Sequence, residues 1–177
     1  MIRRYASQLL LTPDGEWMSN AVLELSDNGK IERFFSLSGL HTETAHTLFL
    51  DGVIAPAPLS LKQHLTQEDI QQLSENYFYL NLENEIITPP SKENKKPLLI
   101  DFGSTDLLIA DNRFVRHLKE LSQLSMREVV MAVCVRPAQC LREIHPTHPI
   151  PEGMMLWEDV DFAGDRLTID TRIRPLH

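Results

Sequence analysis

The sequence predicts a mixed α/β (α+β) fold, with β-strands at both ends of the chain and helices between them. Alternating apolar and polar residues, separated by turn signals, fill residues 1–60 and return in residues 150–177. Helix-start signals lie between these two stretches, in residues 61–149. The length of 177 residues is enough to bury a real core, so we expect a single domain over residues 1–177.

Composition narrows the class of protein. The net charge of −8 and the pI near 5.3 argue against a basic face for nucleic acid. No apolar run reaches the roughly 18–20 residues that a membrane helix needs, and residues 14–16 interrupt the N-terminal run before signal-peptide length. Cys134 and Cys140 fit neither a disulfide framework nor a zinc knuckle and are predicted to be buried, reduced thiols. We therefore expect a cytoplasmic protein without nucleic-acid or membrane partners.

The N-terminal third predicts strands joined by tight turns. Residues 5–11 are a short apolar run closed by the Thr-Pro-Asp-Gly turn of residues 12–15. Residues 20–25 alternate apolar and polar side chains, and residues 31–37 are their expected partner strand. The Asn-Gly pair within residues 27–30 favours a hairpin between these two strands.

The apolar segment over residues 47–54 predicts a further strand, and its few charges predict burial on both faces. Pro56 and Pro58 end it, because proline cannot donate to a sheet ladder. A helix is expected to begin after Thr66, which can cap it together with Asp69. The apolar side chains expected to share one face are Leu65, Ile70, Leu73 and Tyr77.

The second half of the chain returns from helices to strands. Residues 88–97 predict a loop and residues 97–102 a buried strand. Residues 114–124 have helical spacing, and Ser125 with Glu128 forms a capping-box pattern for another helix.

Three further segments complete the chain. Pro137 favours a helix start, and the prolines of residues 145–152 indicate an extended linker. Residues 153–157 and 167–173 then predict the last two strands.

Four pieces of the sequence carry a family resemblance. They are N-G-K-I at residues 28–31, L-D-G-V-I at 50–54, D-L-L-I-A-D-N at 106–112, and the Pro, Ala and Leu within 137–141. These pieces resemble parts of the amidohydrolase superfamily of metal-dependent hydrolases. In order, the parts are the N-terminal hairpin, the entry to the first barrel strand, a late metal-binding strand and a following helical passage. The resemblance implies a sandwich-like composite β-domain closed by both ends of the chain, with residues 1–60 and 150–177 meeting in one sheet.

The chain departs from this family at the metal site. The two histidines of the family's H-x-H motif fall on Ala57 and Leu59, while Arg136 and Arg142 replace an Asn and a Gly of the helical passage. A typical barrel has about 250 residues, whereas only about forty residues occupy the place of most of it here. The resemblance therefore implies a small helical remnant of a barrel, over residues 61–149, that lacks the H-x-H ligands.

Asp106 is the one candidate catalytic residue. The resemblance places it where the family's aspartate binds the metal and handles the proton of the attacking water. A hard or borderline metal needs several ligands at once, however, and the family's other ligands are missing. The alternative is that Asp106 or Asp111 caps the following helix, which needs no partner residues.

The histidines give weak signals. His145 and His148 have acidic neighbours, but Pro146 and Pro149 forbid the regular helix that would make their spacing converge, so surface-loop histidines are expected. His41 and His46 flank a polar segment and are likewise expected to be surface-loop histidines. His64 and His117 are isolated on stretches expected to be helical, and a lone histidine is weak evidence for a site.

Other reactive motifs are missing from the sequence. There is no G-x-S-x-G, P-loop or G-x-G-x-x-G pattern, and neither cysteine has a basic context. The carboxylates within residues 158–165 lack EF-hand spacing and predict an acidic hairpin turn. We therefore expect no metal site and no cofactor.

Three hypotheses for function remain open. The first is a non-catalytic, truncated amidohydrolase-like protein, a pseudoenzyme that acts as a binding or assembly module and forms a homodimer to cover exposed apolar faces. The second is a small metal-dependent hydrolase with a site rebuilt around Asp106 and a histidine such as His64 or His145. The third is an accessory subunit of a full-length amidohydrolase. The missing histidines argue against an enzyme, and the sequence indicates no substrate, ligand or biological process.

Overall fold

The described residues form a mixed α+β fold with a six-stranded sheet, a two-stranded sheet and helices, as the sequence predicts. The computed structural model describes residues 1–37, 46–84, 87–91, 93–102, 113–150 and 152–177. Within this part of the chain, no helix is long and apolar enough to cross a membrane.

The chain divides into two compact units. The first comprises Met1–Ala57, Glu152–Asp159 and Arg172–His177, and the second comprises Pro58–Pro151 and Val160–Thr171. A single domain over residues 1–177 stays a prediction.

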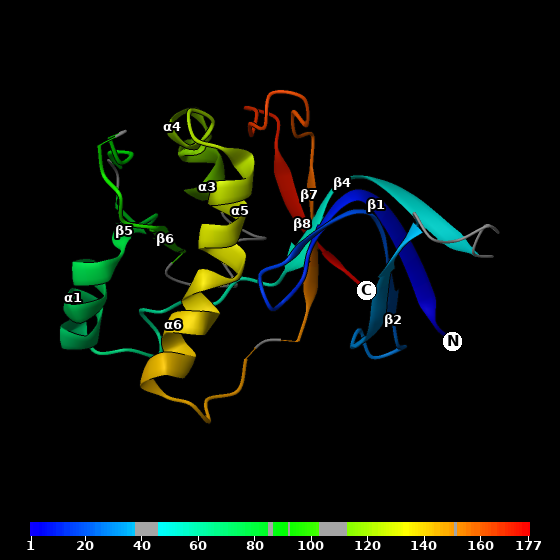
Figure 1. Cartoon of the computed structure of the whole chain (residues 1–177), viewed down its shortest axis with the longest axis horizontal. Helices are drawn as coiled ribbons and strands as arrows, with labels where there is room; N and C mark the ends of the chain where they lie inside the picture. Colours follow the sequence, from blue (N-terminus) through cyan, green and yellow to red (C-terminus); the bar gives the residue numbers. More distant parts are fainter. Residues whose placement is uncertain (38–45, 85–86, 92, 103–112, 151) are drawn as a thin grey trace. The chain divides into compact units, whose positions relative to one another are not determined.

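The first unit is a sheet whose strands come from both ends of the chain (Figure 1). Its strands are β1 (Arg3–Leu11), β2 (Trp17–Leu25), β3 (Ile31–Ser36), β4 (Thr47–Pro56), β7 (Met154–Glu158) and β8 (Arg172–Leu176). Their spatial order is β3-β2-β1-β4-β7-β8, and β1 and β4 run parallel while the other neighbours are antiparallel. The C-terminal strands therefore extend the sheet from β4, and not from the β2–β3 hairpin.

The turns of this sheet form where the sequence predicts them. Gly15 and Gly29 have φ of 89° and 76°, a conformation that glycine adopts without steric cost. The amide of Ser26 donates to the carbonyl of Lys30 at 2.9 Å, which closes the β2–β3 hairpin. The Tyr5 hydroxyl donates to the carbonyl of His177, so the two ends of the chain also meet through a side chain.

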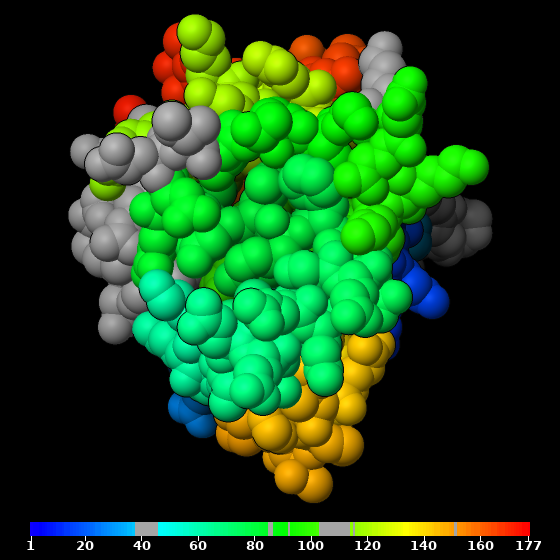
Figure 2. All heavy atoms as spheres, turned by 90° about the vertical axis from the view of Figure 1, so that its left-hand side faces the viewer, coloured from blue at the N-terminus to red at the C-terminus, as the bar shows by residue number. Residues whose placement is uncertain are grey.

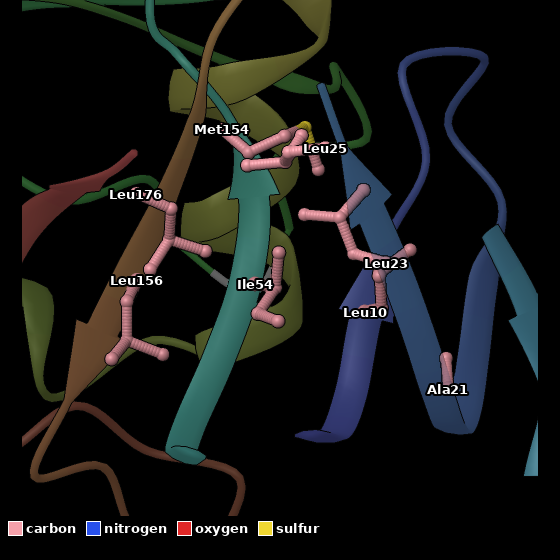
Figure 3. Packing of buried hydrophobic residues seen from close by; sticks show 8 residues of the cluster. All are labelled: Leu10, Ala21, Leu23, Leu25, Ile54, Met154, Leu156 and Leu176. Atoms are coloured by element: carbon pink, nitrogen blue, oxygen red, sulfur yellow. The ribbon is translucent and has the colours of Figure 1, made fainter. Parts of the chain in front are cut away.

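The core of the first unit joins the N-terminal and C-terminal strands (Figure 3). Its buried members are Leu10, Ala21, Leu23, Leu25, Ile54, Met154, Leu156 and Leu176. Ile54 on β4 lies between Leu10 on β1 and Leu156 on β7. Burying one such leucine or isoleucine side chain stabilises a fold by about 1.5–3 kcal/mol, so this cluster holds the two ends of the chain together.

Gly52 allows β7 to approach β4. A Cβ atom at this position would lie 2.3 Å from the carbonyl oxygen of Trp157, and the φ of Gly52 is 153°. Only glycine fits this backbone and this contact without displacement of the strand. The register that follows pairs Val53 with Trp157 and Pro56 with Met154.

The second unit combines helices with a parallel two-stranded sheet. Its elements are α1 (Gln67–Asn76), β5 (Phe78–Asn81), β6 (Leu98–Asp101), α3 (Arg113–Arg116), α4 (Leu118–Leu121), α5 (Met126–Cys134) and α6 (Arg136–Ile144). Thr66 and Asp69 form the predicted capping box at the start of α1. Pro137 lies in the first turn of α6, also as predicted.

A second cluster of apolar side chains holds α1, β6 and α6 together with the segment that follows β4. Its buried members are Leu59, Leu61, Leu65, Leu73, Leu99, Cys140 and Leu141. Ile70 and Tyr77 pack against it, so the predicted apolar face of α1 is confirmed.

The prediction that residues 47–54 are buried on both faces is wrong for their first half. Leu48 and Phe49 are 57% and 70% exposed, whereas Val53 and Ile54 are fully buried. The reason is the length of β7, which pairs with the second half of β4 only. The scarcity of charged residues thus predicted burial along all of this strand, although β7 does not extend beside its first half.

Two local predictions also need correction. Residues 167–173 are not one strand, because Thr168 and Thr171 form a hydrogen-bonded turn and β8 begins only at Arg172. Residues 114–124 form two short helices, α3 and α4, instead of one.

The predicted capping box at Ser125 forms only in part. The Ser125 hydroxyl accepts from the amide of Glu128. The Glu128 carboxylate instead accepts from Arg136 at 2.6 Å and from the amide of Leu98 at 3.3 Å. An ion pair between α5 and α6 thus replaces the second half of the box.

Candidate functional site

Among the described residues of the second unit, Asp101 is the most enclosed acidic side chain. It ends β6 and is 0% exposed. Its Oδ1 accepts from the amide of Leu61 at 3.2 Å and from the hydroxyl of Ser60 at 3.4 Å. Its Oδ2 accepts from the amide of Lys62 at 3.0 Å and from the hydroxyl of Tyr79 at 2.7 Å. We call this arrangement the Asp101 clamp.

The electrostatics of the clamp follow from burial. Desolvation and the adjacent Asp101 carboxylate raise the pKa of Tyr79 far above its usual value, so this hydroxyl keeps its proton and remains a donor. Beside the clamp, the Lys62 ammonium pairs with Glu83 at 2.7 Å. The clamp is therefore a carboxylate enclosed by neutral donors, with an ion pair next to it.

The clamp fixes the chain near the place where the amidohydrolase resemblance locates the H-x-H motif. Leu59 is 4% exposed and packs in the core of the second unit, so its side chain is structural. The amide of Ala57 donates to the carbonyl of Gly153 at 2.8 Å. A carboxylate with four protein donors can anchor a loop, and it offers few lone pairs to a further ligand.

Asp106 and Asp111 lie outside the described residues, as does His41. His117 is buried, and its Nε2 lies 3.1 Å from the carbonyl oxygen of Leu82, which is a structural contact. In the part of the chain that the structure describes, no three His, Cys, Asp or Glu side chains are arranged to hold a metal ion.

The two cysteines are buried, as predicted, and no disulfide joins them. Burial raises the pKa of the Cys140 thiol to about 11, which makes it a poor nucleophile at neutral pH. Residues 158–165 contain the predicted acidic turn. The backbone of Asp161 forms an antiparallel β-bridge with that of Arg166, and the Asp161 carboxylate accepts from the amide of Gly164 at 3.0 Å.

One pair of histidines was not predicted from the sequence. His64 and His148 lie in different turns of the second unit, and their ring centroids are 4.5 Å apart. His145 is exposed and caps α6. Nothing in the local sequence around His64 indicates this partner, because 83 residues separate the two.

The exposed end of β4 is a further surface feature. Leu48 and Phe49 are adjacent, so they point to opposite faces of the strand. Leu50 is partly buried against the core of the first unit. We call Leu48–Asp51 the β4 edge segment; among the described strands, it pairs with β1.

Neither a scan against models of protein families nor a search of curated proteins finds a match for this chain.

Proposed function

We propose that this protein is a non-catalytic assembly module, related to the amidohydrolases by truncation, that forms a homodimer through the β4 edge segment. The observation that carries the proposal is the exposure of two large apolar side chains, Leu48 and Phe49, on consecutive positions of one strand. Large exposed apolar groups on a strand mark surfaces that bind another chain.

The sequence of the segment suits pairing with a second copy of itself. A two-fold axis through Phe49 makes the two edge segments antiparallel, with Phe49 opposite Phe49 and Leu48 opposite Leu50. Asp51 of each copy then faces Thr47 of the other, so no like charges are opposed. Strand addition supplies backbone hydrogen bonds as well as apolar contacts.

The Asp101 clamp supports a non-catalytic role. A catalytic carboxylate needs a lone pair or a proton available to substrate, metal or water. Asp101 directs its oxygens to the backbone of Leu61 and Lys62 and to the hydroxyls of Ser60 and Tyr79. These bonds hold residues 60–62, which directly follow Leu59, the second position that the amidohydrolase resemblance assigns to the H-x-H motif.

Sedimentation equilibrium of the purified chain tests the proposal. We expect a monomer–dimer equilibrium that Phe49→Asp shifts to monomer, because the carboxylate would be buried against its own symmetry mate. Ile169→Asp is the matched control, since Ile169 is 74% exposed in the second unit and should leave the equilibrium unchanged.

Other results would favour the alternative functions. A strictly monomeric wild-type chain at micromolar concentration would contradict the homodimer. A monomer that co-purifies with a full-length amidohydrolase would support the accessory subunit, and bound metal that Asp106→Ala removes would support the rebuilt hydrolase.

A further inference from the structure

His64 and His148 bring two turns of the second unit into contact. His64 lies between β4 and α1, and His148 lies in the turn after α6. Their ring centroids are 4.5 Å apart, and the ring planes are inclined by 68°. We propose that this pair binds one divalent transition-metal ion of the zinc class, with one imidazole nitrogen from each ring and solvent at the remaining positions.

His148 is held in the tautomer that a metal ligand needs. Its Nδ1 lies 2.8 Å from the carbonyl oxygen of Pro149, and a carbonyl can only accept. In the neutral ring Nδ1 therefore carries the proton and Nε2 carries the lone pair. Metal-binding histidines commonly donate their other ring N–H to a backbone carbonyl in this way.

The His64 ring is accessible to an ion. Its side chain is exposed, so an ion can reach the ring from solvent. A neutral imidazole is the form that binds a metal ion, and it offers one ring nitrogen with a free lone pair.

The core of the second unit lies beneath the His64 turn and beneath the end of α6, four residues before His148. Leu61 and Leu65 flank His64 and are buried in the same cluster as Leu141, with Ile144 packed against it. Figure 2 shows the cyan-green surface of the segment after β4 directly beside the orange surface at the end of α6. The histidines therefore stand on two segments whose separation is set by packing, which limits the entropy lost when an ion binds.

The chemistry of the pair favours zinc, copper or nickel over magnesium or calcium, because imidazole is a borderline ligand. Two nitrogens that each bind a tetrahedral zinc ion at about 2.0–2.1 Å lie about 3.4 Å apart. Imidazole rings with centroids 4.5 Å apart can reach this separation by side-chain rotation. The net charge of −8 further favours a cation.

Titration of the untagged, full-length chain with zinc chloride tests the site. After removal of metal by a chelator, we expect calorimetry to show one zinc ion per chain and the imidazole proton resonances of both histidines to shift. His64→Gln and His148→Gln should each weaken binding more than about tenfold. His46→Gln is the control, since His46 is an exposed histidine of the first unit.

Several outcomes would overturn the site. One is the absence of stoichiometric zinc binding, and another is an equal loss of zinc affinity in His46→Gln. A third is a loss of zinc affinity in His145→Gln or Asp106→Ala while His64→Gln retains it. Circular dichroism of the metal-free variants checks that they fold. The Phe49→Asp variant should bind zinc with unchanged affinity, and the His64→Gln variant should self-associate as the wild type does. The metal site and the proposed dimer are therefore tested independently.

Discussion

Glu24 in the first unit and Asp101 in the second are both nearly inaccessible carboxylates, 3% and 0% exposed. Glu24 lies between two guanidinium groups, at 2.8 Å from Arg4 Nε and 2.6 Å from Arg33 Nε. Asp101 accepts hydrogen bonds from two backbone amides and two hydroxyls. The same functional group is therefore stabilised by opposite charge in one unit and by neutral donors in the other.

The difference shows what each carboxylate does. The ion pairs of Glu24 connect three neighbouring strands, because Arg4, Glu24 and Arg33 lie opposite one another on β1, β2 and β3. The side chain of Arg33, on the outer strand β3, is 64% exposed. Solvent and salt screen such pairs. The amide and hydroxyl donors of Asp101 depend on geometry, so the clamp fixes one conformation of a loop.

Replacement of Asp101 should have the largest effect on stability. Asp101→Ala leaves the amides of Leu61 and Lys62 and the hydroxyl of Tyr79 without this acceptor. We expect the free energy of unfolding to fall by about 3–5 kcal/mol, measured by urea denaturation. Asp170→Ala, at an exposed position, should change it by less than about 0.5 kcal/mol. A small effect at Asp101 would show that the clamp is dispensable.

Glu24→Gln should have the next largest effect. The amide side chain keeps the shape of the carboxylate but loses its charge and one acceptor oxygen, which weakens the three hydrogen bonds from Arg4 and Arg33. We expect the free energy of unfolding to fall by about 2 kcal/mol. High salt should reduce this difference, and a value that does not respond to salt would contradict the role of the two arginines.

The effect of Glu24 should also depend on pH. The hydrogen bond from Arg33 lowers the pKa of Glu24 to about 2 from 4.5 against the opposing effect of burial, and Arg4 adds to the lowering. Because the pKa is lower in the folded state, the stabilisation is complete above pH 4.5 and is lost as the pH falls toward 2. Unfolding curves of wild type and Glu24→Gln should therefore converge over this interval, whereas parallel curves would contradict the ion pairs.

Tyr79→Phe should have the smallest effect, about 1 kcal/mol, because Asp101 keeps its other donors. The pKa of Tyr79 is raised in the folded state, mainly by burial and then by Asp101, so its stabilisation is present below the unfolded-state value of 10.0 and is lost at higher pH. The difference between wild type and Tyr79→Phe, followed by urea denaturation, should accordingly shrink above that pH. A difference that grows would mean that the hydroxyl does not donate to Asp101.

Local signals in the sequence predict local structure well in this chain. Thr66 with Asp69 marks the start of α1, and Gly29 marks the β2–β3 turn, because capping and turn formation depend on neighbouring residues. The burial of β4 is predicted only in part, since it depends on how far β7 extends.

The long-range contacts of the sites could not be predicted in the same way. Asp101 follows an apolar run, but its partner Leu61 is 40 residues away in the sequence. His64 meets His148 only because α6 packs on the segment after β4. Such pairings are set by tertiary packing, and no periodicity or motif in a single sequence encodes them.

Hydrogen–deuterium exchange of the β4 edge segment tests the proposed assembly most directly. Exchange is compared at protein concentrations well below and well above the midpoint of self-association. We predict that residues 48–51 exchange more slowly at the higher concentration, that Phe49→Asp abolishes this protection, and that β3, the outer strand Ile31–Ser36, exchanges equally at both. Self-association with unchanged exchange of residues 48–51 would contradict the account.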